Sequence, residues 1–200
     1  RSSKEPVWIL DEAYSGRSTK DKLAAVREKM KEKGAEVHLL ASLYDIAWLL
    51  NVRGNDISYV PVVLSYLALT QEQCIWFLQE EVVDDTLREY LQKNGITTRP
   101  YEAFYEYVKT LENQTILLNR AVVNTKICNN LPESAQMIDA EDPTLEMKAV
   151  KNETEISNTR KAHVKDAVAM CRFMYWLKKN VGKIPMTEIS ASDYLESLRR

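Results

Sequence analysis

The stretch with the most chemical potential is a polar run at residues 51–56 that lies between two apolar segments. It contains Asn51, Arg53, Gly54, Asn55 and Asp56. A guanidinium group can bind a carboxylate through two parallel hydrogen bonds, and loops between buried elements often present functional groups. The same residue types are also typical of a plain turn in which Asn51 and Asp56 bond the backbone. Both interpretations, a functional loop and a capped turn, are open on residue types alone.

Few other residues could act as acids, bases or nucleophiles. The two histidines are His38, in an expected strand, and His163, on an expected helix, and no serine or cysteine lies in a nucleophile motif. We interpret His38 as a hydrogen-bonded or half-exposed strand residue and His163 as a residue that packs against a neighbouring domain. No set of histidines and carboxylates has metal-ligand spacing. We therefore predict no catalytic residue and no metal ligand in this chain.

One expected helix opens on a group of acids that could be mistaken for a metal site: Glu80, Glu81, Asp84 and Asp85. Negative side chains in the first turn of a helix interact favourably with the positive end of the helix dipole. We therefore interpret these acids as stabilising charges on a solvated turn. Asp45 has the same interpretation, because it follows the expected helix cap Ser42 by three residues.

The composition is that of an ordinary globular protein. Of the 200 residues, 45% are hydrophobic and 28% are charged, which is enough for one large core or two small ones. A net charge of −2 offers no basic surface to a phosphate backbone, so we expect no nucleic-acid partner. The longest apolar run, residues 60–69, is shorter than the roughly 20 residues of a membrane span. Cys74, Cys128 and Cys171 show no disulfide or zinc pattern, which indicates reduced thiols, and with no signal peptide in view we expect a cytoplasmic protein.

Strand and helix patterns alternate along the first two thirds of the chain. Helices are expected at residues 18–33, 42–50, 80–94, 101–111 and 122–131, and strands at residues 36–41, 60–70, 73–78, 96–98 and 115–118. Only Gln71 and Glu72 separate two of the strands, which predicts an antiparallel hairpin. The pattern therefore predicts the α/β class, with a mixed β-sheet flanked by helices. With only five glycines, the chain has no dinucleotide-binding fingerprint.

The sequence changes character after residue 136. Residues 137–143 are expected to form a polar crossing, and a long helix of about 28 residues follows, well above the mean of about 11 to 12. Gly182 and Pro185 end it, and a further helix is expected from Thr187. A helix this long favours a second domain. Because the chain starts at Arg1 without a methionine and ends at Arg200 within a helical pattern, we expect it to be a piece of a longer protein.

Two blocks of the sequence resemble one enzyme family. The first block is SLYDIAWLLNVRGND at residues 42–56, followed by PVVLSY at residues 61–66. The second is KNETEI at residues 151–156, RKAHVKDAVAM at residues 160–170 and TEISA at residues 187–191. In this order they are similar to the middle domain, and to the entry into the catalytic domain, of the three-domain Xaa-Pro aminopeptidases (aminopeptidase P).

The resemblance implies a division of the chain into three parts. Residues 1–17 would be an interdomain linker, residues 18–143 a creatinase N-terminal-like α/β domain, and residues 144–200 the N-terminal helices of a truncated pita-bread metallopeptidase domain. Family members remove the N-terminal residue of peptides with proline at the second position, using two divalent metal ions, usually Mn²⁺. Their five metal ligands correspond to positions beyond Arg200, so neither His163 nor Asp166 is assigned as a ligand.

The resemblance also implies a role for Arg53. In relatives, the domain before the pita-bread domain helps to wall off the substrate cleft and takes part in dimer contacts, so a homodimer is expected. Arg53 would be the substrate-binding residue of this piece, pairing with a substrate carboxylate or with an acidic group of the catalytic domain. The plain Arg-Gly turn remains the alternative. Family members often carry asparagine where this chain has Val60, so no contact is transferred from that position.

Two functions follow as hypotheses. In the first, the chain is a non-catalytic fragment of a metal-dependent exopeptidase, the Xaa-Pro aminopeptidase, and serves in substrate-cleft formation and dimerisation. In the second, it is a creatinase-fold binding module of a pita-bread homologue that has lost its metals and only recognises a partner. The presence or absence of the five ligands decides between them.

Overall fold

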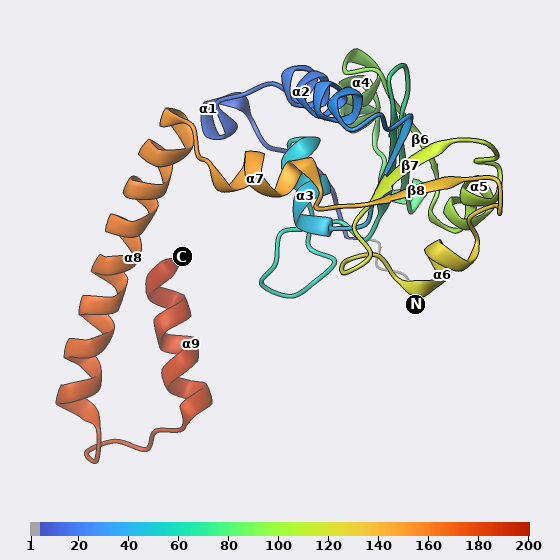
Figure 1. The fold of residues 1–200 in the computed structure, drawn as a ribbon. Coiled ribbons are helices and arrows are strands. Elements are labelled where there is room, and N and C mark those ends of the chain that lie inside the picture. Colours follow the sequence, from blue (N-terminus) through green and yellow to red (C-terminus); the bar gives the residue numbers. More distant parts are fainter. Residues whose placement is uncertain (1–4) are drawn as a thin grey trace. The chain divides into compact units, whose positions relative to one another are not determined.

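The computed structural model describes residues 5–200, and the chain divides into two compact units (Figure 1). One unit ends at Lys151, and the other comprises Asn152–Arg200. The first is built on a β-sheet and the second is a pair of helices.

Within residues 5–200, one sheet of six strands forms the centre of the first unit, in the order β6-β5-β4-β2-β7-β8. The strands are β2 (Val37–Leu40), β4 (Tyr66–Thr70), β5 (Cys74–Leu78), β6 (Ile96–Pro100), β7 (Thr115–Leu118) and β8 (Gln136–Asp139). Strand β2 is antiparallel to β4 and parallel to β7, and β4 and β5 form the expected antiparallel hairpin. The outer strands β6 and β8 are parallel to their neighbours. The mixed sheet predicted from the sequence is confirmed.

Helices cover both faces of this sheet (Figure 1). On one face lie α2 (Thr19–Glu32), α3 (Leu43–Leu49) and α4 (Asp85–Lys93), and on the other α5 (Phe104–Lys109) and α6 (Thr125–Asn129). Side chains of a strand alternate between the two faces. Accordingly, Leu67 and Trp76 pack with the first helices, whereas Tyr66 and Phe77 pack with α5 and α6. The short helix α7 (Pro143–Ala149) packs against α2 and α3.

Residues 7–17, part of the expected linker at residues 1–17, contribute one strand to a small second sheet. Strand β1 (Trp8–Ile9) pairs antiparallel with β3 (Val52–Arg53), and helix α1 (Glu12–Ser15) follows. Val7 is buried in the core on the α2 side of the large sheet. The pairing of β1 with β3 therefore connects the start of the described chain to the strand that carries Arg53, and buried Val7 packs this start into the core.

The predicted strand at residues 60–70 is too long, because β4 begins only at Tyr66. Pro61 has no backbone N–H for a strand ladder. The N–H of Leu64 donates instead to Oδ2 of Asp56 at 2.6 Å. Val62 and Val63 are buried all the same, so a buried loop here imitates the apolar pattern of a strand.

The expected polar crossing at residues 137–143 is wrong in its first part, where Gln136–Asp139 form β8. An edge strand needs few apolar residues because one side of it faces solvent, and Met137 is 41% exposed. Some helix starts also differ from expectation. Glu80–Val82 and Tyr101–Ala103 are 3₁₀ turns, and α6 begins at Thr125 after its cap Asn124.

The second unit, all of whose residues are described, consists of α8 (Glu153–Asn180) and α9 (Glu188–Arg199) side by side (Figure 1). The 28 residues of α8 confirm the predicted length, and a capping box of Asn152 and Glu155 begins it. The rings of Trp176 and Tyr194 lie 4.2 Å apart between centroids. Many apolar side chains of this unit are exposed, such as Val164 and Ile189. No helix among the described residues has the length and apolar character to cross a membrane.

Candidate functional site

Arg53 lies on strand β3 opposite Trp8, rather than in an open turn. Its Nη1 donates hydrogen bonds to the carbonyl oxygens of Ala47 at 2.9 Å and Val52 at 2.8 Å. The first of these carbonyls belongs to α3, so the half-buried guanidinium ties the end of that helix to β3. The structural role of Arg53 is therefore visible, and its role toward a substrate stays a prediction.

A buried polar clamp holds the residue that leads into β3. Asn51 is 1% exposed and has φ of 50°, a left-handed conformation that asparagine tolerates better than most residues. Its Oδ1 accepts a hydrogen bond from Nζ of Lys22 at 2.7 Å, and its Nδ2 donates to the carbonyl oxygen of Arg17 at 2.9 Å. Asn51 thus acts as predicted for a turn, but with a lysine from α2 as its partner.

Lys22 was missed in the sequence although a signal for it exists. The buried face of α2 contains Thr19, Leu23, Val26 and Met30, and Lys22 lies on it, four residues before Val26. The lysine is 1% exposed, its Nζ also donates to the carbonyl oxygen of Trp48 at 2.8 Å, and it lies 4.3 Å from the Trp48 ring centroid. A lysine in the middle of an apolar helix face predicts such a buried, fully engaged ammonium group.

The loop after Arg53 is fixed at its base and exposed at its tip. A Cβ on Gly54 would lie 2.8 Å from Cγ2 of Val63, so only glycine fits there. At the tip, Tyr59 is 93% exposed and has φ of 65°, next to a bridge between Ile57 and Val60. The carboxylate of Asp56 in this loop accepts a hydrogen bond from the N–H of Leu64, so it holds the loop, and the exposed tip presents the aromatic ring of Tyr59.

A second group of polar residues is buried where β2, α3 and α7 meet. His38 is fully buried, and Asp45 and Asp142 are 3% and 5% exposed. Nε2 of His38 lies 3.9 Å from Oδ1 of Asp142, and Lys148 lies 2.6 Å from Oδ1 of Asp45. His38 is hydrogen-bonded, as expected for a strand residue, and is more deeply buried than expected. Asp45 is in the first turn of α3 as predicted, but a lysine of α7 pairs with it. His38 and the two aspartates are buried, so they cannot contact a substrate, and only Lys148, with a 27% exposed side chain, reaches solvent.

The other polar residues from the sequence analysis have structural partners or are exposed. Asp84 caps α4 by accepting a hydrogen bond from the N–H of Leu87 at 2.8 Å, which supports the interpretation of that acidic turn. Asp166 pairs with Arg199 at 2.7 Å, and His163 is exposed on α8. Across residues 5–200, no three His, Cys, Asp or Glu side chains lie close enough together to hold a metal ion. The residues present do not fit a metal centre.

The aromatic residues of α5 belong to the core as predicted. The rings of Tyr66 and Phe104 stack at 4.2 Å between centroids. The hydroxyl groups of Tyr66 and Tyr105 are 3.0 Å apart, and Nδ2 of Asn124 donates to Tyr66 at 3.0 Å. Burial raises the pKa of both tyrosines. These hydroxyl groups therefore stay protonated and serve as hydrogen-bond partners.

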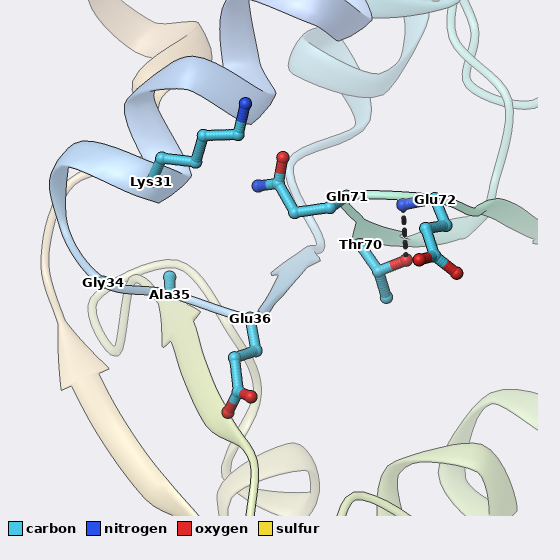
Figure 2. A pocket seen from close by; sticks show the side chains of 7 residues that line it. All are labelled: Lys31, Gly34, Ala35, Glu36, Thr70, Gln71 and Glu72. Atoms are coloured by element: carbon cyan, nitrogen blue, oxygen red, sulfur yellow. Dashed lines mark hydrogen bonds between the residues drawn. The ribbon is translucent and has the colours of Figure 1, made fainter.

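An open hollow of about 490 Å³ lies between the end of α2, the start of β2 and the β4–β5 turn (Figure 2). Its lining residues are Lys31, Gly34, Ala35, Glu36, Thr70, Gln71 and Glu72. In Figure 2 the side chains of Lys31 and Glu36 point away from each other, and Oε2 of Glu36 accepts a hydrogen bond from the N–H of Thr115 at 2.7 Å. The hollow therefore lacks the convergent polar groups of a ligand site.

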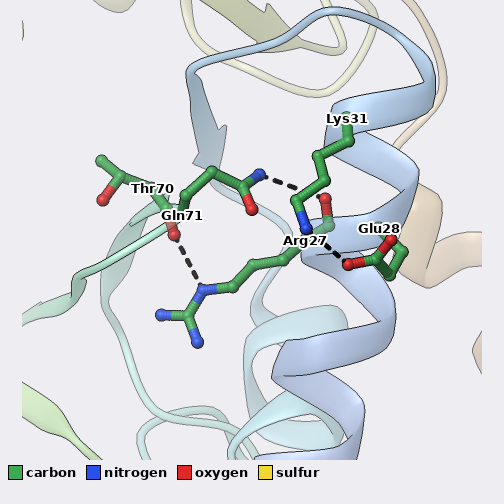
Figure 3. A network of polar contacts seen from close by, with 5 residues as sticks. All are labelled: Arg27, Glu28, Lys31, Thr70 and Gln71. Atoms are coloured by element: carbon green, nitrogen blue, oxygen red, sulfur yellow. Dashed lines mark hydrogen bonds and ion pairs between the residues drawn. The ribbon is translucent and has the colours of Figure 1, made fainter.

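The polar contacts beside this hollow hold the hairpin to α2 (Figure 3). Nε of Arg27 donates to the carbonyl oxygen of Thr70 at 2.8 Å, and Nε2 of Gln71 donates to the carbonyl oxygen of Arg27 at 3.1 Å. Lys31 pairs with Glu28 on the same helix. Arg27 is thus a structural arginine that donates to a carbonyl oxygen. A substitution of Arg27 is therefore a suitable control for a substitution of Arg53.

Comparison with known protein families identifies the family of this chain. The model of the creatinase/prolidase N-terminal domain matches residues 1–155. The chain belongs to this family. The creatinase-type α/β fold expected from the resemblance is therefore confirmed, and the six-stranded mixed sheet is its centre.

Xaa-Pro aminopeptidases of this family are similar along nearly the whole chain. Xaa-Pro aminopeptidase 1 of Dictyostelium discoideum is 32% identical over 98% of the chain, and a probable Xaa-Pro aminopeptidase P of Laccaria bicolor is 36% identical over 96%. The crystal structure of X-prolyl aminopeptidase from Caenorhabditis elegans, described as a cytosolic enzyme with a di-nuclear active site, superposes on 99% of the chain with a TM-score of 0.89 and 29% identity.

The likeness covers only part of these proteins. The chain spans 32% of the Dictyostelium protein, 31% of the Laccaria protein and 33% of the Caenorhabditis chain. A prolidase-type structure, the Xaa-Pro dipeptidase from Bacillus anthracis, shares the fold with a TM-score of 0.61 and 15% identity. The resemblance seen in residues 42–66 and 151–191 is thus confirmed for the segment that this chain represents.

Proposed function

We propose that this chain is a non-catalytic part of a metal-dependent exopeptidase that removes the N-terminal residue preceding proline. The observation that carries the proposal is the superposition of 99% of the chain on the Caenorhabditis X-prolyl aminopeptidase with a TM-score of 0.89. Sequence identities of 32% and 36% over 96–98% of the chain also support it. The relatives are about three times as long as this chain. A catalytic centre can therefore lie in the part of the protein that this chain does not include.

In this proposal the metal chemistry belongs to the rest of the protein. The whole enzyme would use two Mn²⁺ ions or another divalent pair, in line with the di-nuclear active site named for the Caenorhabditis enzyme. Residues 18–143 would form the creatinase N-terminal-like domain, with residues 1–17 as a linker before it. Residues 144–200 would begin the pita-bread domain, and exposed apolar side chains on α8 and α9 such as Val164 and Ile189 agree with this role.

Arg53 is the proposed substrate-binding residue. Two hydrogen bonds from Nη1 fix its side chain, and the clamp of Lys22 on Asn51 fixes the strand that carries it. A binding group held by surrounding hydrogen bonds loses little conformational entropy when a ligand arrives. Its charge suits a carboxylate, either of a peptide or of an acidic residue in the catalytic domain.

The partners and location follow from the same proposal. The substrates would be peptides with proline at the second position, and the protein would act as a homodimer in the cytoplasm. The description of the Caenorhabditis relative as cytosolic supports the location. The net charge of −2 gives no reason to add a nucleic-acid partner.

The test is a hydrolysis assay with a tripeptide that has proline at position two. A complete protein that contains this chain should release the first residue in the presence of Mn²⁺, lose activity with a chelator and regain it when Mn²⁺ returns. The 200-residue chain alone should release nothing. If the complete protein binds the peptide without cleaving it, the alternative of a non-catalytic binding module is correct.

A further inference from the structure

The strongest unexplained feature of the molecule is the buried polar group at the start of α7. His38 of β2 and Thr144 of α7 are fully buried, and Asp142, which occupies the N-cap position of α7 without a side-chain cap hydrogen bond, is 5% exposed. Nε2 of His38, Oδ1 of Asp142 and Oγ1 of Thr144 are buried, and each lacks a hydrogen-bond partner. Buried polar atoms without partners are costly and rare, so this group needs an explanation.

The hydrogen bond of His38 fixes where its ring proton lies. Nδ1 is 3.1 Å from the carbonyl oxygen of Leu117 on the neighbouring strand β7. A carbonyl oxygen only accepts hydrogen bonds, so Nδ1 must carry a proton. In a neutral ring Nε2 is then an acceptor, and it lies 3.9 Å from Oδ1 of Asp142. The two atoms can bond only if a proton lies between them.

The charges around Asp142 favour its protonated form. From α3, the carboxylate of Asp45 faces it, and from α7 the ammonium of Lys148 does. Nζ of Lys148 lies 2.6 Å from Oδ1 of Asp45, so these two groups form an ion pair. On the α2 side, Lys29 faces Glu146 of α7. One lysine therefore balances one buried carboxylate, and an ionised Asp142 beside a neutral His38 would add an unbalanced charge.

The pKa directions agree with this charge count. Burial lowers the pKa of His38 to about 4, and the Leu117 carbonyl and Asp45 oppose that shift only in part. Burial, followed by repulsion from Asp45, raises the pKa of Asp142 to about 7, against the attraction of Lys148. Both directions favour a neutral imidazole beside a protonated carboxyl group.

We propose that His38 and Asp142 form a neutral, proton-sharing clasp that fixes the start of α7 on the central sheet and opens when the shared proton is lost. The carboxyl O–H of Asp142 donates to Nε2 of His38, which needs a closure of about 1 Å from the present separation. The clasp joins β2 in the middle of the sheet to the helix that ends just before Asn152, where the second compact unit begins.

The clasp has a characteristic pH signature. In the unfolded chain, between pH of about 4 and 6.5, the one proton of the pair is on the histidine, and in the fold it is on the aspartic acid. The proton count is the same in both states, so stability does not depend on this pair in that range. Above pH of about 7 the folded Asp142 loses its proton, and the clasp opens.

In the wild-type chain the effects of His38 and Asp142 on the pH dependence of stability cancel. Single substitutions should expose these two effects, which have opposite signs. Asp142→Asn leaves His38, whose lowered pKa makes the fold less stable as pH falls from about 6.5 to 4. His38→Asn leaves Asp142, whose raised pKa makes the fold less stable as pH rises from about 4 to 7. Each slope approaches a tenfold change in the folding equilibrium constant per pH unit. The control Asp139→Asn, at the exposed edge strand β8, should leave the wild-type profile unchanged.

The decisive measurement uses the full 200-residue chain labelled with ¹⁵N-histidine. At pH 6 the ring nitrogens of His38 should give the signals of a neutral imidazole protonated at Nδ1. Amide exchange of residues 144–149, corrected for its intrinsic pH dependence, should be faster at pH 8 than at pH 6. Asp142→Asn should remove that pH dependence and leave the signal of His163 in place. An imidazolium signal from His38 at pH 6, or equal protection of α7 at both pH values, would overturn the proposal even if the His38 variant fails to fold.

Discussion

Nζ of Lys22 lies 2.7 Å from Oδ1 of Asn51 and joins helix α2 to the residue that precedes β3. The same ammonium group bonds the carbonyl oxygen of Trp48 at the end of α3. Arg53 bonds the carbonyl oxygen of Ala47 in the same helix, so both cations donate to carbonyl oxygens of α3. The position of the proposed substrate-binding arginine thus depends on a buried lysine far from it in sequence.

Lys22→Met should remove both hydrogen bonds and leave Asn51 without its buried donor. Because hydrogen bonds that involve a charged group contribute about 1.5–3 kcal/mol, we expect the free energy of unfolding to fall by about 2–3 kcal/mol. Denaturant unfolding measures this change. Lys31→Met is the matched control, since Lys31 forms an exposed pair with Glu28. If both substitutions lower the free energy of unfolding by the same amount, the hydrogen bonds of Lys22 do not stabilise the fold as proposed.

Gly54→Ala should distort the loop that follows Arg53. The new Cβ would lie 2.8 Å from Cγ2 of Val63 and 3.0 Å from the carbonyl oxygen of Val62, so the cost should be about 1–3 kcal/mol. Gly34→Ala meets no atom within 4 Å but has φ of +69°, and its cost of about 1 kcal/mol should come from backbone strain alone. Amide exchange should therefore increase at residues 54–65 only in the Gly54 variant.

Cys74 and Cys171 should differ sharply in reactivity. Burial raises the pKa of Cys74 to about 12, and the positive charge of Arg27 offsets this only in part, whereas Cys171 is exposed. Only the thiolate reacts, so at pH 8 Cys74 should be alkylated at least about 100-fold more slowly than Cys171. Mass spectrometry of the labelled peptides separates the sites. Fast labelling of Cys74 in the native protein would contradict its buried position in β5.

Much of the fold could be predicted because the central strands carry their signal locally. Cys74–Leu78 is apolar throughout and buried on both faces, and the short connection before it determines an antiparallel pair. Strand β8 was missed because half of an edge strand faces solvent. Residues 60–65 were misassigned because a buried loop shows the same apolar run as a strand.

The candidate site was harder to predict than the fold. Arg53 and Asn51 drew attention as polar residues between apolar runs, but Lys22 lies on another helix, and only tertiary packing brings it to Asn51. The clasp of His38 with Asp142 joins residues more than a hundred positions apart, and neither has a local signal for the other. Periodicity reports which face of an element is buried, and it cannot report which buried polar groups meet.

Arg53→Ala tests the proposed substrate contact in the complete protein. Loss of a charge-assisted contact should lower kcat/KM for an Xaa-Pro peptide by at least about tenfold while the fold is retained. Arg27→Ala is the control, because Arg27 also donates to a carbonyl oxygen, yet lies beside the hairpin turn. If both variants lose stability and activity in parallel, Arg53 is only a structural arginine of the β3 segment.

The proposed parent protein of this chain is a proline-directed exopeptidase. The most direct test of this claim compares two tripeptides, identical except for proline or alanine at position two, with the complete protein and Mn²⁺. We predict release of the first residue from the proline peptide, little release from the alanine peptide, and none from either with the 200-residue chain alone. Failure to cleave the proline peptide, or equal cleavage of both peptides, would contradict the claim.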